Sequence, residues 1–501
     1  MINFFGINKN PVQILLTSDR TLMSNYHGKE FLGFGTSVPP NVVPDSIFRF
    51  IFFPKIPTRR GMPVEAPYGL RKIEAKLLDE GFGALTTTPN HLKDYIREAD
   101  VLCLHTMDPF GWGPSSSTFT KVLKTGKPFV ARYFERLLDR KEVVRAKERG
   151  LKIIVGGPGA WQFRYDTEFL ERHDIDSVMI GEGDLAVIDL ARRALDGEEL
   201  PQFYDVKKED IPTVEEIPEI KNPSINGLIE VGRGCVRHCK FCEVAKRPLR
   251  WYPLEKIEKE MKVNARRGNA KNVILHAEDV PLYGSKNTIP AREKVLDLMK
   301  LAKRYNDNVS WSHASIAAVA ADPKLIEECS EVILDEKQSW WGAEVGIETG
   351  SPRLMKETMA GKAHPFDIEE WPEIVKTGMG IANDNNLVPA CTLIVGLPGE
   401  EEDDVIKTIE LVEDLKDYKS LIVPLFFVPL GQLTKEDWFE AEEVTELQRE
   451  LLIMCLKHGL RWSRAFVDDY YEEGMRGKLL SFPMKYFIRA IKRRAKKEGF
   501  I

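Results

Sequence analysis

Hydrophobic and polar positions follow two different periods along the first part of the chain. Short apolar runs predict buried strands, and those before residue 196 are Val12–Thr17, Gly83–Thr88, Val101–His105, Ile153–Val155 and Ser177–Ile180. Between these runs, apolar residues recur at helical spacing, as Leu70, Ile73 and Leu77 do before the stop at Gly81. Strands that alternate with helices indicate a parallel sheet covered by helices. We therefore expect a doubly wound, Rossmann-like α/β domain at residues 1–196.

Two segments of this region depart from the alternation. Ser46–Pro57 is rich in aromatic residues, and we expect it to be a buried strand or loop rather than an exposed apolar patch. Met107–Phe119 is rich in Gly, Pro and Ser, which predicts a loop. Its aromatic residues, Phe110 and Trp112, are either ordinary loop side chains or a cover for a flat ring.

A second alternating series follows residues 197–224, whose prolines and acidic residues predict a linker. The strands predicted after Gly227 are Leu228–Val231, Val273–His276, Val309–Ser312, Ala343–Ile347, Thr392–Val395 and Leu421–Phe427. Because helical stretches separate them, residues 225–432 are expected to form a partial (β/α)6 barrel. The chemistry of such barrels gathers at the C-terminal ends of the strands.

The remaining residues, 433–501, are predicted to form a helical extension. Val444–His458 has apolar residues on one face, and Ser481–Phe500 combines apolar residues with a run of lysines and arginines. A basic amphipathic helix is typical of a membrane surface or an acidic partner. The alternative is a helix that packs its apolar face on the barrel.

Length and charge narrow the class of protein. A chain of 501 residues is long enough for two or three domains. Its net charge of −6 gives no general reason to expect binding to nucleic acid. The first residues lack the pattern of a signal peptide, and the sequence has no apolar run long enough to span a membrane. We therefore expect a cytoplasmic protein, with peripheral membrane contact as an option for the C-terminal helix.

Three of the seven cysteines are grouped: Cys235, Cys239 and Cys242 have the spacing C-x3-C-x2-C. Thiolates this close together suit a soft metal or an iron–sulfur cluster. Zinc usually takes four ligands in two pairs, but no second pair follows, and His238 inside the loop is awkwardly placed as a fourth ligand. An odd trio without a secretory signal is not typical of disulfides. Three cysteine ligands would leave one iron of a cluster open.

The cysteine spacing, with Phe241 directly before the last cysteine, resembles the radical S-adenosylmethionine (SAM) superfamily. The resemblance implies a 4Fe-4S cluster held by the three cysteines, with SAM bound at the open iron. Glu344–Ser351 is similar to the fourth-strand motif of the superfamily, and Gly396–Glu400 is similar to its fifth strand-to-helix turn. By this resemblance we expect contacts with the cofactors from Phe241, Ser312, Gly346, Glu348 and Gly396. His276–Asp279 and Ser312–His313 end two other predicted strands and are further candidates for contacts with SAM or substrate.

The N-terminal region resembles the cobalamin-binding domain that precedes many radical SAM cores. The resemblance is carried by Pro67–Leu70, Gly156–Pro158 and Ile180–Gly183, and it implies that Gly156, Gly157 and Gly181 line a cofactor crevice at the strand ends. One feature departs from the pattern: the D-x-H-x-x-G motif that ligates cobalt does not follow the first predicted strand. His105 is the nearest substitute, and it is expected to be structural or to face substrate. Binding of cobalamin without this histidine, or no corrinoid at all, are the two alternatives.

This resemblance implies an enzyme that forms a 5′-deoxyadenosyl radical and modifies an unactivated carbon, with C-methylation as the expected reaction. The expected partners are a small-molecule or lipid-like substrate and an electron donor such as ferredoxin or flavodoxin. The alternatives are radical coupling, cyclisation or rearrangement without cobalamin, and a non-catalytic iron–sulfur partner protein. A methylthiotransferase would usually carry a second cysteine trio upstream, and only Cys103 lies there. No residue is singled out as catalytic beyond these cofactor contacts.

Overall fold

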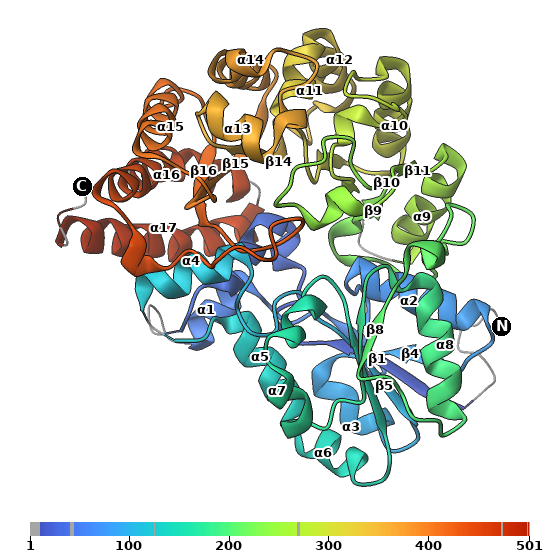
Figure 1. Ribbon diagram of the computed structural model, residues 1–501. Helices are drawn as coiled ribbons and strands as arrows, with labels where there is room; N and C mark the ends of the chain where they lie inside the picture. Colours follow the sequence, from blue (N-terminus) through green and yellow to red (C-terminus); the bar gives the residue numbers. More distant parts are fainter. Residues whose placement is uncertain are drawn as a thin grey trace. The chain divides into compact units, whose positions relative to one another are not determined.

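A computed structural model describes residues 11–40, 45–124, 126–267, 271–471, 474–497 and 499 (Figure 1). The chain divides into two compact units. Unit 1 comprises Met1–Ile229 and Glu255–Ala270, and unit 2 comprises Glu230–Leu254 and Lys271–Ile501. Helix α9, Leu254–Arg267, therefore follows the first strands of unit 2 in sequence but lies almost entirely in unit 1.

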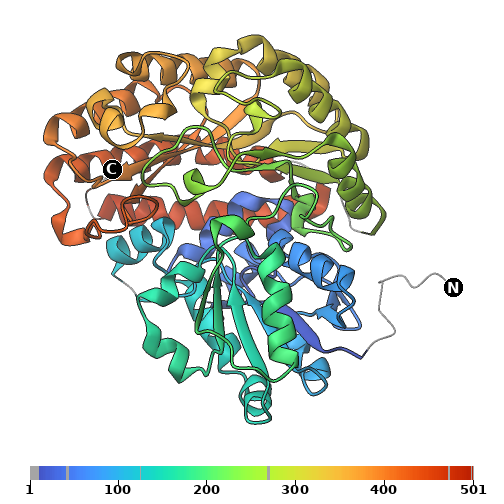
Figure 2. The ribbon, with the colours of Figure 1, turned by 45° about the vertical axis from the view of Figure 1, so that its right-hand side comes forward.

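Unit 1 is built on one parallel sheet, which Figure 2 shows between its helices. Its six strands lie in the order β4-β1-β5-β6-β7-β8. The strands are β1 Ile14–Ser18, β4 Ala84–Thr86, β5 Val101–His105, β6 Lys152–Gly156, β7 Ser177–Ile180 and β8 Phe203–Asp205. From β1 the chain adds β4 on one side and β5 with all later strands on the other. The strand order therefore reverses between β1 and β5, and this switch point is where doubly wound sheets bind ligands. The expected doubly wound fold is confirmed.

Helices cover both faces of this sheet. One apolar core lies under α2, Tyr68–Asp79, and α8, Gly183–Leu195, and includes Leu70, Leu77 and Leu190. The other lies under α3 Leu92–Tyr95, α5 Phe129–Leu138, α6 Lys141–Lys147 and α7 Thr167–Arg172. Two covered faces explain why β1, β5 and β6 read as nearly continuous apolar runs.

Two parts of unit 1 differ from the sequence-based expectations. The aromatic segment is not a strand or loop, because Asp45–Phe52 forms helix α1. Its buried residues Phe48, Ile51 and Phe52 have helical spacing, and Phe48 stacks on Phe129 of α5. The predicted linker contributes β8, which pairs with β7 and completes the sheet.

The predicted loop at Met107–Phe119 is also partly helical, because α4 spans Pro114–Leu123. Phe110, before this helix, is buried against Phe163 and Phe169 with ring centroids 5.0 and 4.8 Å away. It therefore belongs to the core and does not cover a ligand.

Unit 2 contains the six expected strands of a partial barrel. They are β9 Ile229–Glu230, β12 Asn272–His276, β13 Asn308–Trp311, β14 Trp341–Glu348, β15 Leu387–Val395 and β16 Leu421–Phe426. Two sheets, β13-β12-β9 and β14-β15-β16, are joined by an isolated parallel bridge between His313 and Glu344. Helices α10 Arg292–Tyr305, α14 Trp371–Asp384 and α16 Glu446–Tyr471 contact β13, β15 and β16, respectively.

Buried and half-buried residues alternate along these strands, as in Trp341–Ile347 and Leu387–Val395. Alternation means that one face of each strand is covered, whereas the other is partly open. Polar or small residues occupy the partly open face near the strand ends: His276, Glu344, Gly346 and Thr392. An open, polar strand face differs from the filled interior of a complete barrel.

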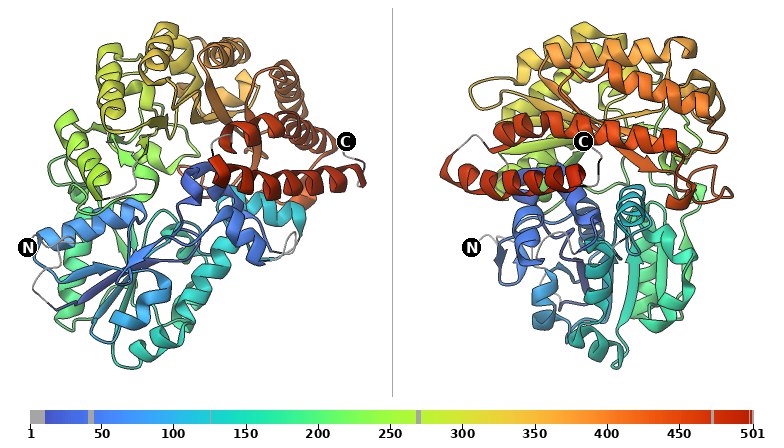
Figure 3. Two further views of the ribbon diagram at one scale, coloured as in Figure 1. Left: turned by 180° about the vertical axis from the view of Figure 1, so that it is seen from behind. Right: turned by 90° about the vertical axis from the view of Figure 1, so that its left-hand side faces the viewer.

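The chain ends in two long helices of unit 2, α16 and α17, Gly474–Lys497, which lie side by side (Figure 3). Met484 and Ala495 of α17 are buried, whereas Phe482 and Tyr486 are exposed. Helix α17 thus packs on α16, and part of its aromatic surface is left uncovered. None of the described helices is apolar enough over a sufficient length to cross a bilayer.

Candidate iron–sulfur and cofactor sites

The three grouped cysteines lie in a closed loop directly after the first barrel strand. β10, Gly232–Arg233, pairs antiparallel with β11, Arg250–Trp251, and the loop between them carries all three thiols. Gly234 has a φ of +86°, and a Cβ there would lie 2.4 Å from the Pro248 carbonyl oxygen, so only glycine fits this close turn. Cys239 is buried, and Cys235 and Cys242 are half-buried.

The donor set fits a cluster better than a single ion. Among the described residues, no three His, Cys, Asp or Glu side chains converge where one metal ion could be held. A four-iron cluster binds each cysteine to a different iron, so its ligands need not converge. The ring of His238 faces the Ala245 carbonyl oxygen at 3.3 Å. The loop thus offers three thiols, which would hold a four-iron cluster and would leave one iron without a cysteine ligand.

Burial also shows what a metal must do here. It raises the pKa of the Cys235 thiol to about 12 and raises the pKa of Cys239 and Cys242 as well. Without metal these thiols are protonated at neutral pH, and binding a cluster releases their protons.

Two glycines fasten the loop to the rest of unit 2. A Cβ at Gly361 would lie 2.2 Å from the Arg237 carbonyl oxygen, and one at Gly431 would lie 2.4 Å from that of Lys240. Between these points, the Lys240 amide donates to the Thr358 carbonyl oxygen at 2.8 Å. The backbone of the cluster loop is therefore held by close contacts and hydrogen bonds.

The predicted cofactor residues Phe241, Gly346 and Glu348 are brought together by Lys362. The Lys362 ammonium lies 2.8 Å from Glu348 Oε1 and 5.9 Å from the centroid of the Phe241 ring. Burial alone would lower the pKa of Lys362, but the charges of Glu348 and of Cys239 outweigh this effect and raise it. Glu348 ends β14 at a φ of +65° and also accepts a hydrogen bond from Thr392 Oγ1 at 3.2 Å.

Gly346 makes room for this ion pair. A Cβ at this position would lie 2.0 Å from Glu348 Oε1 and 2.6 Å from Lys362 Nζ. Sequence reasoning missed Lys362 because it follows Glu348 by fourteen residues and carries no motif signal.

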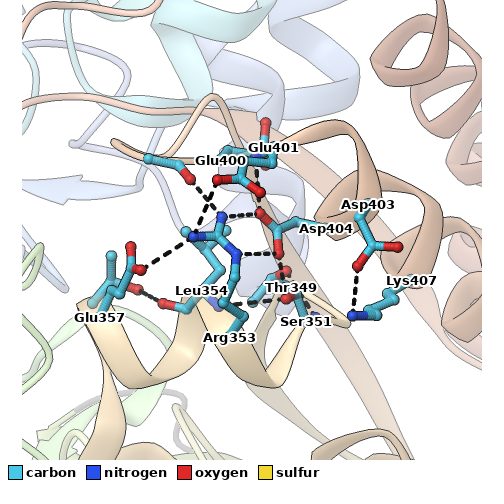
Figure 4. Close-up of polar contacts among 12 residues, drawn as sticks. Thr349, Ser351, Arg353, Leu354, Glu357, Glu400, Glu401, Asp403, Asp404 and Lys407 are labelled. Atoms are coloured by element: carbon cyan, nitrogen blue, oxygen red, sulfur yellow. Dashed lines mark hydrogen bonds and ion pairs between the residues drawn. The ribbon is translucent and has the colours of Figure 1, made fainter.

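Gly396 turns the chain after β15 at a φ of +82°, and its amide donates to Glu400 Oε2 at 3.0 Å. A network beside this turn joins it to the end of β14 (Figure 4). Asp404 accepts from Ser351 Oγ at 2.5 Å and pairs with Arg353, which donates to the Gly399 carbonyl oxygen at 2.6 Å. The two turns expected to contact SAM are thus tied to each other.

A polar cluster occupies the partly open strand face of unit 2. His313 Nε2 lies 3.3 Å from Glu344 Oε2, and His313 Nδ1 lies 3.0 Å from Ser312 Oγ. The His276 ring is 5.7 Å from that of His313, and its buried Nδ1 has no hydrogen-bond partner. Burial lowers the pKa of His313, but the hydrogen bond and charge of Glu344, with the charge of Glu278, raise it to about 9.

The glycines of unit 1 that were expected to line a crevice make close contacts within the chain. A Cβ at Gly157 would lie 2.5 Å from the Thr106 carbonyl oxygen, and one at Gly181 would lie 2.7 Å from Val206 Cβ. Gly156 is less crowded, since its nearest neighbour would be Met179 Cε at 3.1 Å. Contact of these three glycines with a cofactor stays a prediction.

Buried polar atoms without partners lie at the C-terminal ends of the neighbouring strands β1 and β5. Asp19 and Thr106 directly follow the paired residues Ser18 and His105, and Asp19 Oδ2 and Thr106 Oγ1 make no hydrogen bond. On α4, the hydroxyls of Ser116 and Ser117 are also buried and unpartnered. Burial raises the pKa of Asp19 to about 6. Buried polar groups nearly always have a partner, so these atoms indicate a missing one.

Asp19 also stands where the cobalt-ligating motif was sought. Asp19–Ser24 follows β1 directly, and Thr21 takes the place that the motif gives to histidine. Asp19 Oδ1 accepts from the Thr21 amide at 2.7 Å and from its hydroxyl at 2.5 Å. His105 is half-buried, and desolvation of its ring lowers its pKa to about 4, so the ring is neutral at pH 7. An aspartate two residues after the predicted strand Val12–Thr17 was the signal that sequence reasoning missed.

Comparison with known proteins agrees with both units. Residues 229–412 match the sequence model of the Radical SAM superfamily. The curated relatives include a putative methylthiotransferase, MJ0865, of Methanocaldococcus jannaschii, which is 26% identical over 288 residues, or 54% of this chain and 60% of that protein. The ribosomal protein uS12 methylthiotransferase RimO of Clostridioides difficile is 28% identical over 276 residues, which are 54% of this chain and 58% of that protein. The chain thus matches about 60% of the length of these relatives.

A solved structure resembles most of the chain. It is the radical SAM methyltransferase TsrM of Kitasatospora setae with cobalamin and a 4Fe-4S cluster bound, with a TM-score of 0.55 and 13% identity. The match covers 85% of this chain and 77% of that one. At this level of identity it establishes a shared fold. Residues 229–412 are thus similar to the radical SAM superfamily, and most of the chain shares the fold of a radical SAM methyltransferase whose structure holds cobalamin and a 4Fe-4S cluster.

Proposed function

We propose that this protein is a cobalamin-dependent radical SAM methyltransferase that transfers a methyl group to an unactivated carbon. The observation that carries the proposal is the set of buried, unpartnered polar atoms at the switch point of unit 1, Asp19 Oδ2 and Thr106 Oγ1. A polar ligand at this edge would supply their partners, and cobalamin is the ligand that the neighbour TsrM holds. The cysteine loop of unit 2 supplies the second requirement.

The residues of unit 2 divide the work of holding the cofactors. A SAM-bound 4Fe-4S cluster supplies one-electron cleavage of SAM, and a corrinoid supplies methyl-group transfer. Cys235, Cys239 and Cys242 would hold the cluster. Lys362 and Glu348 present a cation and an anion 2.8 Å apart, which complement the carboxylate and ammonium groups of SAM. The pair would orient SAM, and the covered faces of the strands exclude water from one side.

The polar cluster on the open strand face is the proposed contact for substrate. His313 is held as a cation by Glu344, and His276 is neutral because burial and the neighbouring His313 lower its pKa. Such a pair offers a proton donor beside a proton acceptor, which suits a substrate with polar groups. We propose that these histidines bind the substrate and hold the proton that is exchanged with it. A ferredoxin or flavodoxin is the proposed electron donor.

Methylthio transfer is a second candidate because the curated relatives carry that activity in their names. Such enzymes usually hold a second cluster on an upstream cysteine trio. Cys103 is the only cysteine upstream in this sequence, and it lies in the core under α2 and α8, where burial raises its pKa to about 12. A thiol in that position cannot serve a second cluster, so methyl transfer is favoured.

Expression with cobalamin, followed by anaerobic reconstitution with iron and sulfide, tests the proposal. We expect a corrinoid absorption spectrum. We also expect about three to four irons per chain, which corresponds to one 4Fe-4S cluster. Addition of SAM and dithionite should consume SAM. A chain with a cluster but no corrinoid would favour radical coupling, cyclisation or rearrangement, and a cluster that leaves SAM intact would favour a non-catalytic partner protein.

The proposed substrate is a small molecule or one held at a lipid surface, and α17 supports the second option. Phe482 and Tyr486 are 74% and 62% exposed, and Arg489, Arg493 and Lys496 continue the same helical face. Aromatic and basic side chains on one face suit an anionic bilayer surface. Co-sedimentation with vesicles of anionic lipid should exceed that with neutral vesicles and should fall for F482S/Y486S. Equal recovery in both pellets would refute membrane contact and leave a freely diffusing substrate.

A further inference from the structure

Arg237 lies in the three-residue spacer between Cys235 and Cys239, and its side chain is only 4% exposed. Burial of a guanidinium is costly unless the surroundings supply partners. A buried arginine between two cluster ligands therefore calls for a specific explanation.

The guanidinium finds partners on three separate segments. Nε donates to Asp279 Oδ2 at 2.8 Å, and Nη2 donates to Ser315 Oγ at 2.6 Å. Nη1 donates to the carbonyl oxygens of Lys362 at 2.8 Å and His364 at 2.9 Å. Asp279 lies beyond the end of β12, and Ser315 is the N-cap of α11, Ile316–Ala321. One side chain thus links the cysteine loop to β12, to α11 and to the segment that carries Lys362.

Asp279 is held as firmly as the arginine. Its Oδ1 accepts from the Ser315 amide at 2.9 Å, and its Oδ2 accepts from the Ser315 hydroxyl at 2.6 Å. Arginine, aspartate and serine therefore form a fully bonded triad in which two opposite charges are buried. Such a pair adds little net stability compared with apolar side chains of the same size, so its presence points to another role.

Both charges lie close enough to the thiols to affect them. Arg237 lies two residues from both Cys235 and Cys239, and its guanidinium pairs with Asp279 at 2.8 Å, so both charges stand beside the cysteine loop. The Arg237 amide also lies 3.4 Å from Cys235 Sγ as a hydrogen-bond donor. Nearby charge and hydrogen bonds to sulfur are the factors that set the potential of an iron–sulfur cluster.

We propose that Arg237 and Asp279 are positioning residues that anchor the cysteine loop and set the reduction potential of its cluster through their opposite charges. The inference rests on the proposed function only in requiring the cluster. A reduced cluster carries one more negative charge than an oxidised one. Arg237 therefore stabilises the reduced form, and Asp279 opposes it.

The test compares variants that break the same contact but remove opposite charges. R237M breaks the ion pair by removing the guanidinium, and D279N breaks it by replacing the carboxylate with a neutral amide. After anaerobic reconstitution, potentiometric titration followed by electron paramagnetic resonance should show a lower midpoint potential for R237M and a higher one for D279N. R237K keeps the charge but loses the forked geometry, so its potential should stay near that of the wild type while its iron content falls. The affinity of R237M for the cluster should be about 10- to 100-fold lower than that of the wild type.

A matched control separates these effects from general loss of stability. Arg292 forms a two-point contact with Asp322, which joins α10 to α12, Pro323–Ile333, away from the cysteine loop. R292M should lower the melting temperature and leave iron content, spectrum and potential unchanged. If R237M does not fold, the comparison of D279N with R237K still decides the sign of the charge effect.

Equal potentials in R237M, D279N and wild type, or shifts in the same direction, would overturn the inference. Failure of the proposed function would look different, because the wild-type chain would then bind no cluster or no corrinoid.

Discussion

At the scale of single residues, the candidate site depends on a glycine that leaves room for a buried ion pair. Gly346 has no side chain, and this absence gives the Glu348–Lys362 pair its space. Gly342, four residues earlier on the same strand, has no such neighbour: its nearest contact for a Cβ would be 3.6 Å away. The two glycines share a strand and a face but have different surroundings, which allows a controlled comparison.

We predict that G346A weakens SAM binding while the cluster remains intact. The added methyl would displace Glu348 or Lys362, and overpacking of this kind costs about 1–3 kcal/mol, which corresponds to about 5- to 150-fold in affinity. Anaerobic titration of the reconstituted protein with SAM, followed by the change in the cluster spectrum, measures the effect. G342A should bind SAM like the wild type. Equal SAM affinity of G346A and G342A would show that Glu348 and Lys362 do not bind SAM.

We predict a pH dependence of stability from His313. The pKa of this histidine is raised from 6.5 to about 9 because Glu344 and Glu278 outweigh the effect of burial. Burial and the charge of His313 lower the pKa of the neighbouring His276. A raised pKa stabilises the fold fully below the unfolded value of 6.5, and this contribution is lost as the pH rises through about 9. The melting temperature of E344Q should therefore lie below that of the wild type near neutral pH and approach it above about pH 9. A constant difference across this range would exclude the titration of His313.

At the scale of elements, the strand-end turns of unit 2 are connected through helix termini. Asp404, in the first turn of α15, Glu402–Asp414, pairs with Arg353 in α13, Pro352–Thr358, and accepts from Ser351 at the start of that helix (Figure 4). Burial raises the pKa of Asp404, but the hydrogen bonds from Arg353 and Ser351 lower it by more, so the pKa lies below its usual value. Its neighbour Asp403 pairs with Lys407 at the surface, 2.6 Å away.

We predict that D404N destabilises the protein much more than D403N. Asp404 is 1% exposed and loses charged hydrogen bonds, which typically costs about 1–3 kcal/mol. The Asp403–Lys407 pair is exposed, and such pairs contribute roughly 0–1 kcal/mol. Chemical denaturation of both variants measures the difference. It is done above about pH 5, where the paired carboxylate is ionised. Similar denaturation midpoints would show that the network does not hold the two turns.

At the scale of the whole molecule, the two proposed cofactor sites lie in different units and should be disturbed independently. Thr106 of unit 1 has a buried hydroxyl without a partner, whereas the Thr17 hydroxyl on β1 donates to the Thr87 carbonyl oxygen at 2.7 Å. Both threonines are fully buried in the same sheet region. Only the first has a hydroxyl that is free for a ligand.

We predict opposite outcomes for T106V and T17V. T106V removes an unsatisfied polar atom, so the apoprotein should be as stable as the wild type or more so, but its corrinoid content should fall. T17V should lower the stability of the apoprotein by about 1 kcal/mol through loss of its hydrogen bond and should leave corrinoid content per folded chain unchanged. Iron content should stay constant in both because the cysteines lie in unit 2. Equal corrinoid loading of T106V and wild type would place the ligand elsewhere.

Most of the fold was predictable because it rests on local patterns. The period of apolar residues located most strands of the two units, and the cysteine spacing located the loop after the first barrel strand. The errors arose where local pattern and tertiary role diverge. Ser46–Pro57 reads as an apolar run, but its helical spacing matters only because α1 packs one side on Phe129. β8 lies in a proline-rich, polar segment and exists because β7 offers it an edge.

The amino-acid sequence by itself determined the alternation of elements, the three thiols and the motifs at the strand ends, because each of these is written in neighbouring residues. The tertiary structure alone decided which residues pack around the loop that carries those thiols. Arg237 reaches Asp279 across 42 positions and Ser315 across 78, and Glu348 meets Lys362 only after the chain has turned back from β14. Such partners are selected by burial, which makes an unpaired charge too costly, and burial is a property of the folded chain.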